Sequence, residues 1–138
     1  MGIQIPDNYR PSPQEPFMNP VQREYFRKKL LRWRDDILKD SQETIRTLQS
    51  ETQPVSDLND RASTESDRSL ELRTRDRQRK LISKIDAALL RIENDTYGYC
   101  DDTGDPISLK RLEARPIATL SLEAQERHER REKSYRDE

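Results

Sequence analysis

The chain has 138 residues, of which 38% are charged and 30% hydrophobic, with 26 basic and 27 acidic side chains and a net charge of −1. Leu, Ile, Val and Phe make about a fifth of the residues, close to the limit below which a chain cannot bury a stabilising core. A conventional globular core is therefore not expected. The abundance of Glu, Lys, Arg, Gln and Leu instead favours long, solvated helices. Near-zero net charge gives no overall attraction to nucleic acid or acidic lipid.

Other protein classes lack their sequence signals. No stretch approaches the 18 or so apolar residues of a membrane span, and the N-terminal segment carries prolines where a secretory signal needs an apolar run. We therefore expect a cytoplasmic protein. One cysteine cannot form an internal disulfide, which agrees with a reducing compartment.

The first 20 residues are predicted to form an extended arm. They hold five of the eight prolines, and proline lacks an amide donor and restricts the backbone, so a continuous helix is not possible there. The arm could be docked on its neighbours or mobile. The side chains available for docking are Ile3, Ile5, Tyr9 and Phe17.

A first long helix is predicted from Pro20 to about Thr52, because Asn19 is a good N-cap and proline is favoured at the first helical position. Its apolar residues recur at helical spacing, in a stripe narrow enough to suit one partner helix. They are Phe26, Leu30, Trp33, Ile37, Thr44 and Leu48.

A second long helix should follow the turn around Pro54, capped by Asp57 or Asn59 and running to Asp95. A short connector makes the two helices antiparallel, in a coiled-coil hairpin over residues 21–95 with its tip near residues 53–62. The apolar side of the second helix has a thin stretch in its first half, so the half nearer the tip should be less stable. That side comprises Leu72, Ile82, Ile85, Leu89 and Ile92.

The C-terminal part, residues 96–138, is predicted to be a small domain and a last helix. Gly98 should break the second helix, and a compact acidic turn follows it to Pro106. A short helix from about Leu109 would end before Pro116, and a charged helix capped by Ser121 or Thr119 would run to about Tyr135. An apolar cluster is expected to hold the domain together. Its residues are Ile107, Leu109, Leu112, Ile117, Leu120 and Leu122. The fold class is therefore mainly α.

Charge is distributed unevenly along the hairpin. Residues 49–60 contain Glu51, Asp57 and Asp60 and no basic residue, whereas residues 73–84, the basic run, hold six basic residues against Asp76. The basic run is either a solvated face with weak salt bridges or a surface for an acidic or phosphate-bearing partner. Nucleic acid is less favoured as that partner, because no aromatic residues interleave with the arginines for base stacking.

Metal binding and catalysis have weak sequence support. Cys100 stands where the first ligand of a Cys-x-x-Cys zinc knuckle would, but the other three positions at the usual spacing hold Thr103, Ser121 and Ala124. No sequence neighbour is expected to lower the pKa of Cys100, so it should be a packing residue. The single histidine, His128, is expected to be exposed. Asp57 and Asp60 could form an acid/base pair, but no pocket-forming residues surround them.

Several motifs together resemble the DksA/TraR family of bacterial transcription factors, over about residues 25–133. They are DRA at residues 60–62, LELRTRDRQRKLI at residues 70–82, YGYC at residues 97–100 and RLEARP at residues 111–116. The long run together with RLEARP makes the resemblance specific.

The resemblance implies a regulator, not an enzyme, that binds RNA polymerase and inserts its hairpin into the secondary channel. With the alarmone ppGpp, such factors change open-complex lifetime, repressing ribosomal RNA promoters and helping some biosynthetic promoters. Family roles carry over by position. The tip residues are Asp57, Asp60 and Ala62; the ppGpp-contacting residues are Leu81, Lys84 and Arg115; the polymerase-binding residues of the basic run are Arg73, Arg75, Arg77 and Arg79.

This sequence departs from the family pattern at several positions. The tip reads DLND, without the proline that follows the first aspartate in well-known members, and Gln125 stands where a phosphate-contacting lysine is expected. Because three zinc ligands are missing, we expect a zinc-finger-like fold without zinc in a monomeric protein. A coiled-coil docking adaptor and a Gre-like transcript cleavage factor are the alternative functions.

Overall fold

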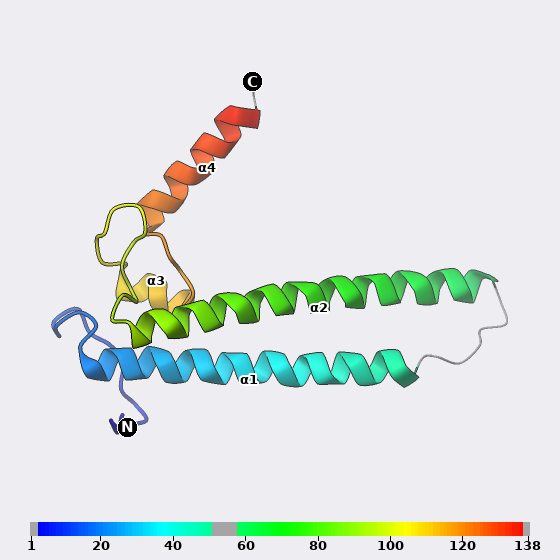
Figure 1. Ribbon diagram of the computed structural model, residues 1–138, viewed down its shortest axis with the longest axis horizontal. Coiled ribbons are helices and arrows are strands. Elements are labelled where there is room, and N and C mark those ends of the chain that lie inside the picture. Colours follow the sequence, from blue (N-terminus) through cyan, green and yellow to red (C-terminus); the bar gives the residue numbers. More distant parts are fainter. Residues whose placement is uncertain (1–2, 51–57, 137–138) are drawn as a thin grey trace. The chain divides into compact units, whose positions relative to one another are not determined.

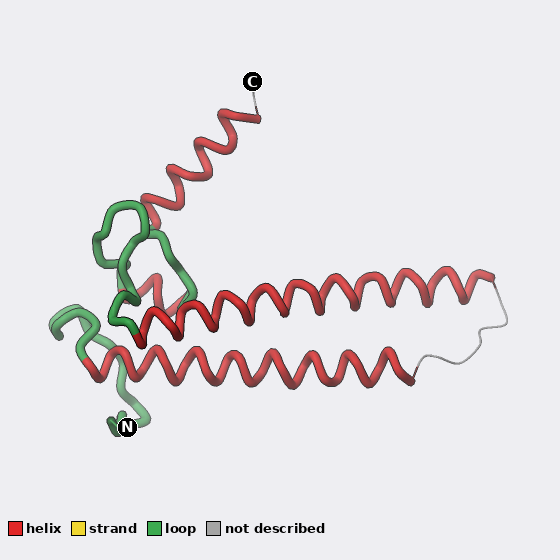
Figure 2. The backbone as a smooth tube through the Cα atoms, in the orientation of Figure 1, coloured by secondary structure: helices red, strands yellow, loops and turns green. Residues whose placement is uncertain are grey.

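The structure, a computed structural model, describes residues 3–50 and 58–136. It describes the side chains of all of these residues except 44, 47–50, 58–64 and 135–136. The described residues form four helices. They are α1 (Pro20–Ser50), α2 (Leu58–Glu93), α3 (Leu109–Ala114) and α4 (Leu122–Arg136). Figure 1 labels the helices in their order along the chain. Figure 2 colours the rest of the described backbone, which consists of loops and turns, in green. The prediction of a mainly α fold is confirmed. Within the described ranges the single β feature is an isolated bridge between Tyr99 and Pro106.

Helix α1 begins where the capping residues predict. The Asn19 side chain accepts a hydrogen bond from the backbone N–H of Gln22 at 2.9 Å, which satisfies a donor that has no partner inside the helix. The Gln22 side chain reaches back and accepts a hydrogen bond from the Met18 N–H at 2.8 Å. This reciprocal arrangement resembles a capping box, one residue removed, and it fixes the start of the helix at Pro20.

The boundaries of α2 differ from the prediction. Asn59 lies inside the helix, so it is not the cap, and Asp57 lies outside the described residues. The helix ends at Glu93, five residues before Gly98, rather than at Asp95. The reason is Asp95, which adopts a left-handed conformation with φ of 61° and so terminates the helix in the manner of a C-terminal cap. Arg23 of α1 forms an ion pair with this aspartate.

The chain forms two compact units, and both long helices contribute to each. The core unit comprises Met1–Leu30 and Ile85–Glu138, and the hairpin unit comprises Leu31–Lys84. In each unit the described parts of α1 and α2 run antiparallel (Figure 1). Among the described helices, none is long and apolar enough to cross a membrane. The predicted division into residues 1–20, 21–95 and 96–138 stays a prediction.

Almost all described burial lies in the core unit. Phe26, Leu30 and Ile85 are completely buried there, with Tyr97 at 1% exposure. The hairpin unit contributes one buried apolar residue among those described, Ile37, at 6%. Ser41 of α1 and Gln78 of α2 add a polar link in this unit, a 2.8 Å hydrogen bond from the Ser41 hydroxyl to the Gln78 side-chain oxygen.

Several apolar residues predicted to be buried are not. Leu72, assigned to the apolar side of the second helix, is 52% exposed, and Leu122, assigned to the C-terminal cluster, is 59% exposed. Trp33, Ile82 and Leu89 are half-buried, while Thr44 and Leu48 have side chains outside the described set. Helical spacing alone gives the stripe but not how far the facing helix covers it. Ala88, completely buried, takes part in the core instead.

The N-terminal arm packs against the rest of the core unit. Phe17 packs edge-on against Tyr99 with 5.4 Å between ring centroids, and Met18 is 8% exposed. Gly98 adopts φ of +93°, and a Cβ there would lie 3.1 Å from the Phe17 ring. Glycine is therefore needed at this position both for the backbone and for the arm to approach.

Candidate functional site

The predicted tip residues lie at the edge of what the structure describes. Asp57 is outside the described residues, and Asp60 and Ala62 lie on the first turns of α2 with side chains outside the described set. Their predicted roles therefore stay predictions. The two aspartates are three positions apart in the sequence.

The basic run occupies the middle of α2 and is mostly solvent-exposed. Four of its six cations recur at i, i+4, i+7 and i+11, and residues at this spacing share one face of a helix. They are Arg73, Arg77, Lys80 and Lys84, all exposed. Arg79 is also exposed but lies off this face, and Arg75 is half-buried. Asp76 pairs with Lys80 at 3.4 Å, an exposed ion pair that leaves the face strongly positive.

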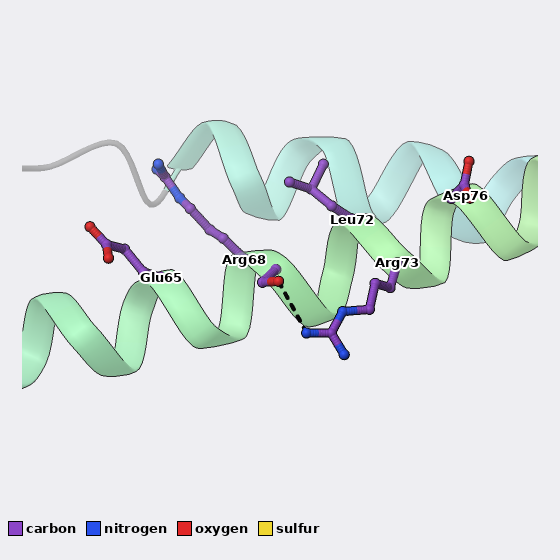
Figure 3. A pocket seen from close by; sticks show the side chains of 6 residues that line it. Glu65, Arg68, Leu72, Arg73 and Asp76 are labelled. Carbon is purple, nitrogen blue, oxygen red and sulfur yellow. Dashed lines mark hydrogen bonds between the residues drawn. The ribbon is translucent and has the colours of Figure 1, made fainter.

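Next to this face, α2 carries an open surface hollow of about 410 Å³ that sequence reasoning missed. Figure 3 shows its walls, where the Arg73 guanidinium donates a hydrogen bond to the Ser69 hydroxyl at 3.3 Å. Leu72 lies in it, and the nearby Leu70 is 59% exposed. A protein partner that covered these leucines would remove apolar surface from water. The hollow is lined by Glu65, Arg68, Ser69, Leu72, Arg73 and Asp76.

The three residues predicted to contact ppGpp lie on two elements. Leu81 and Lys84 are one helical turn apart on α2, in the hairpin unit. Leu81 is half-buried and Lys84 exposed. Arg115, also exposed, is the C-cap of α3 in the core unit, where its backbone N–H donates to the Arg111 carbonyl at 2.7 Å. Two basic side chains are thus available to solvent, as contact with phosphate requires.

Helix α3, which carries Arg115 at its end, is held by contacts from both sides. The Ser108 side chain caps its start by accepting from the Arg111 N–H at 3.2 Å. On α1, Tyr25 and Lys29 both donate to the same Glu113 carboxylate oxygen, at 3.0 and 2.8 Å. Because a carboxylate accepting two hydrogen bonds is well fixed, α3 has a defined position against α1.

The four positions that correspond to zinc ligands come together in space. The Thr103 hydroxyl and the Ser121 backbone N–H both donate hydrogen bonds to the Cys100 sulfur. The Ser121 hydroxyl in turn accepts from the backbone N–H of Ala124 at 3.2 Å, which confirms Ser121 as the N-cap of α4. The predicted knuckle geometry is therefore present around a single thiol.

Cys100 is buried, as predicted for a packing residue, at 2% exposure. The prediction that nothing lowers its pKa is wrong. Burial raises the pKa of the thiol, but the N–H groups of Ser121, Thr103 and Asp102 and the Thr103 hydroxyl all donate to the sulfur, and together they lower the pKa to about 6. These donors come from chain positions up to 21 residues away, or from turn geometry that the sequence does not reveal.

The residues at this knuckle do not fit a structural zinc ion. Zinc needs four N, S or O ligands in tetrahedral arrangement, whereas Ala124 offers no side-chain donor and Thr103 and Ser121 offer only neutral hydroxyls. Over the described residues, no group of three or more His, Cys, Asp and Glu side chains could hold a metal ion.

The single histidine is not a free surface residue. His128 on α4 contacts Asp102 in the loop after α2, with 2.7 Å between Nε2 and Oδ2. Its side chain is 42% exposed and the residue as a whole is half-buried, so it is less exposed than expected because of this contact. This contact joins α4 to the loop that carries Cys100 and Thr103.

Two family models match adjacent parts of the chain. The DnaK suppressor protein DksA N-terminal domain matches residues 22–92, and the prokaryotic dksA/traR C4-type zinc finger matches residues 95–130. The first match covers α1 and α2, and the second covers the knuckle, α3 and the first half of α4.

Relatives along the whole chain agree with these matches. The RNA polymerase-binding transcription factor DksA of Caulobacter vibrioides is 66% identical over 94% of this chain and 92% of its own length, and that of Escherichia coli K12 is 42% identical over 91% and 83%. The solved structure of transcription factor DksA2 from Pseudomonas aeruginosa has 41% identity and a TM-score of 0.79, covering 85% of this chain and 90% of that one. The chain belongs to the DksA family.

Proposed function

We propose that this protein binds RNA polymerase through its hairpin unit and regulates transcription initiation, in a monomeric, cytoplasmic and metal-free form. The observation that carries the proposal is the exposed basic face of α2 next to the exposed Leu70 and Leu72. The relatives named RNA polymerase-binding transcription factor DksA support the choice of partner.

The charge of the hairpin suggests a division of roles. A large acidic macromolecule would meet the part of this face formed by Arg73, Arg77 and Lys80, and charge complementarity would speed the association and fix its orientation. Asp57, Asp60 and Ala62 would then act at the secondary channel near the active site, after binding has occurred. Binding and regulation should therefore be separable by mutation.

The alarmone ppGpp is the proposed effector. Lys84 and Arg115 would contact its phosphate groups at the polymerase surface, with Leu81 beside them, because exposed cations are the usual partners of phosphate. Gln125, half-buried on α4, would make a weaker contact than a lysine there, so the response to ppGpp should be modest. In the proposed role, the protein represses ribosomal RNA promoters and helps some biosynthetic promoters.

Binding and activity of purified full-length variants test this function. An Arg73→Ala/Arg77→Ala variant should lose affinity for core polymerase, while Lys39→Ala, which removes an exposed cation of α1 in the same unit, should bind normally. Asp60→Asn should bind polymerase but lose most inhibition of a ribosomal RNA promoter in vitro. Lys84→Ala should reduce the increment due to ppGpp and keep basal inhibition.

Two results would support the alternative functions. If Asp60→Asn bound polymerase and kept full activity, the tip charge would be dispensable and a docking adaptor would explain the protein better. Cleavage of the transcript in stalled complexes, lost in Asp60→Asn, would indicate a Gre-like factor in which tip carboxylates hold a metal ion. The proposed regulator produces neither result.

A further inference from the structure

Arg115 presents an exposed side chain from a backbone that is fixed on both sides. Its N–H donates to the Arg111 carbonyl at 2.7 Å, and its carbonyl accepts from the Ala118 N–H at 3.0 Å. Its φ of −142° and ψ of 84° lie outside the helical region, which proline disfavours for the residue before it.

Pro116, the next residue, is buried and receives a hydrogen bond from a distant tyrosine. The Tyr97 hydroxyl donates to the Pro116 carbonyl oxygen at 2.8 Å, across 19 positions of sequence. Tyr97 is 1% exposed, and its ring lies 5.6 Å from that of Phe26 on α1. Burial also raises the pKa of Tyr97 above its ordinary range, so the hydroxyl remains a proton donor at every physiological pH.

Tyr97 is itself anchored to the end of α2. Its backbone N–H donates to the Arg91 carbonyl at 3.2 Å, in the turn that follows the helix. A continuous series of contacts therefore runs from α2 through Tyr97 to the carbonyl of Pro116, the residue that follows Arg115. This series explains a feature that packing alone does not, namely why a deeply buried position carries tyrosine rather than phenylalanine.

We infer that Tyr97 is a positioning residue, whose buried hydroxyl holds the Pro116 peptide and thereby fixes the exposed Arg115 guanidinium for contact with a phosphate group. The inference rests on the proposed function, in which Arg115 contacts ppGpp. A cation on a rigid backbone loses less conformational freedom when it binds than one on a mobile loop, so its affinity for phosphate is higher. Tyr97 does not touch the ligand.

The test is in vitro transcription from a ribosomal RNA promoter with full-length Tyr97→Phe. Two concentrations are measured. The first is the ppGpp concentration that gives half of the additional promoter inhibition due to ppGpp. The second is the protein concentration that gives half-maximal promoter inhibition in the absence of ppGpp. The first should rise about threefold to tenfold, as for loss of one ordinary hydrogen bond, and the second should stay within about twofold. A merely structural role would raise both together and would overturn the inference.

Tyr99→Phe is the matched control, because this neighbouring tyrosine is 39% exposed and its hydroxyl has no hydrogen-bond partner among the described residues. It should leave both concentrations unchanged. In the double variant Tyr97→Phe/Arg115→Ala, the ppGpp concentration should be no higher than in Arg115→Ala alone, because Tyr97 acts through Arg115. Full additivity would show that it acts elsewhere and would overturn the inference.

Hydrogen exchange distinguishes failure of this inference from failure of the proposed function. The Ala118 amide should exchange at least about threefold faster in Tyr97→Phe than in Tyr99→Phe, because its acceptor is the Arg115 carbonyl. Unchanged exchange overturns the positioning role whatever ppGpp does. Faster exchange in Tyr97→Phe, together with a wild-type protein that shows no response to ppGpp, would instead overturn the effector proposal. Pro116→Ala, which relaxes the restriction on Arg115, should change exchange and ppGpp response in the same direction.

Discussion

His128 and Asp102 join the last helix to the knuckle, with 2.7 Å between the imidazole Nε2 and the carboxylate Oδ2. The two residues are 26 positions apart, and both side chains remain about one-third or more exposed. The contact is therefore screened by solvent, and its main effect should be on the position of α4 rather than on global stability.

His128→Ala should accordingly lower the free energy of unfolding by only about 0.5 kcal/mol, the usual scale for a solvent-exposed pair. Its clearer effect should be increased motion of α4, measured by NMR relaxation of the amides of residues 122–134. Gln125→Ala, which removes a contact within α4 to Glu129, is the control and should leave these amides unchanged. Equal effects of the two substitutions would contradict a docking role for His128.

Gly98→Ala should destabilise the protein by about 2 to 4 kcal/mol, since it combines a left-handed backbone with a crowded Cβ. The new methyl group would lie 3.1 Å from Phe17 and 3.2 Å from Met18, so the arm would have to move. Gly104→Ala is the matched comparison, because Gly104 has φ of +75° but open space around it. It should cost about 1 kcal/mol in a urea unfolding experiment.

The Cys100 thiol predicts a dependence of stability on pH. Its pKa is about 6 in the folded chain against an ordinary 9.0, so between these values the unfolded chain binds the additional proton. The contribution of Cys100 is therefore complete above about pH 9 and is lost as the pH falls through about 6. The difference in free energy of unfolding between wild type and Cys100→Ser should grow from pH 6 to pH 9. A constant difference would show that the thiol keeps an ordinary pKa.

Restoring the missing thiols should create a metal site. The variant Thr103→Cys/Ser121→Cys/Ala124→Cys should bind one zinc ion per chain and gain thermal stability that chelators remove, because the four positions already lie together. The control, Thr103→Cys/Ser121→Cys, lacks the fourth thiol and should bind far more weakly. Metal analysis of the wild type is the decisive comparison, since stoichiometric zinc there would refute the metal-free proposal.

Docking of the arm should depend on the buried Gln22. Its side-chain oxygen accepts from the Met18 N–H at 2.8 Å and its amide nitrogen donates to the Ser12 carbonyl at 3.4 Å. Gln22→Ala removes the partner of the buried Met18 N–H and should cost about 1 to 3 kcal/mol, while the Ser12 carbonyl still accepts from the Glu15 N–H at 3.1 Å. Gln42→Ala, an exposed glutamine of α1, should be nearly neutral by the same thermal unfolding measurement.

Local sequence signals predicted the helices well. Asn19 and Pro20 defined the start of α1, and Ser121 was one of two candidates for the cap of α4. These signals act over a few residues, which is the range over which hydrogen bonds at helix ends form. The end of α2 was misplaced because a non-glycine residue, Asp95, adopts the left-handed conformation that Gly98 was expected to supply.

Contacts between distant residues could not be predicted in this way. Glu113 receives hydrogen bonds from residues 84 and 88 positions away, and Cys100 receives one from Ser121. No period or short motif encodes such pairs. The exposure of Leu72 was missed for the related reason that a stripe of apolar residues shows which face is apolar, not how much of it a neighbour covers.

The uneven burial along α1 and α2 has a consequence for how this family can vary. In the core unit, side chains such as Phe26 and Ile85 are confined by tight packing, so most substitutions there would be removed because they impair folding. In the hairpin unit, where Ile37 is the one buried apolar residue among those described, folding places few demands on residue identity. Positions that remain invariant among relatives over residues 31–84 should therefore be kept by binding rather than by folding.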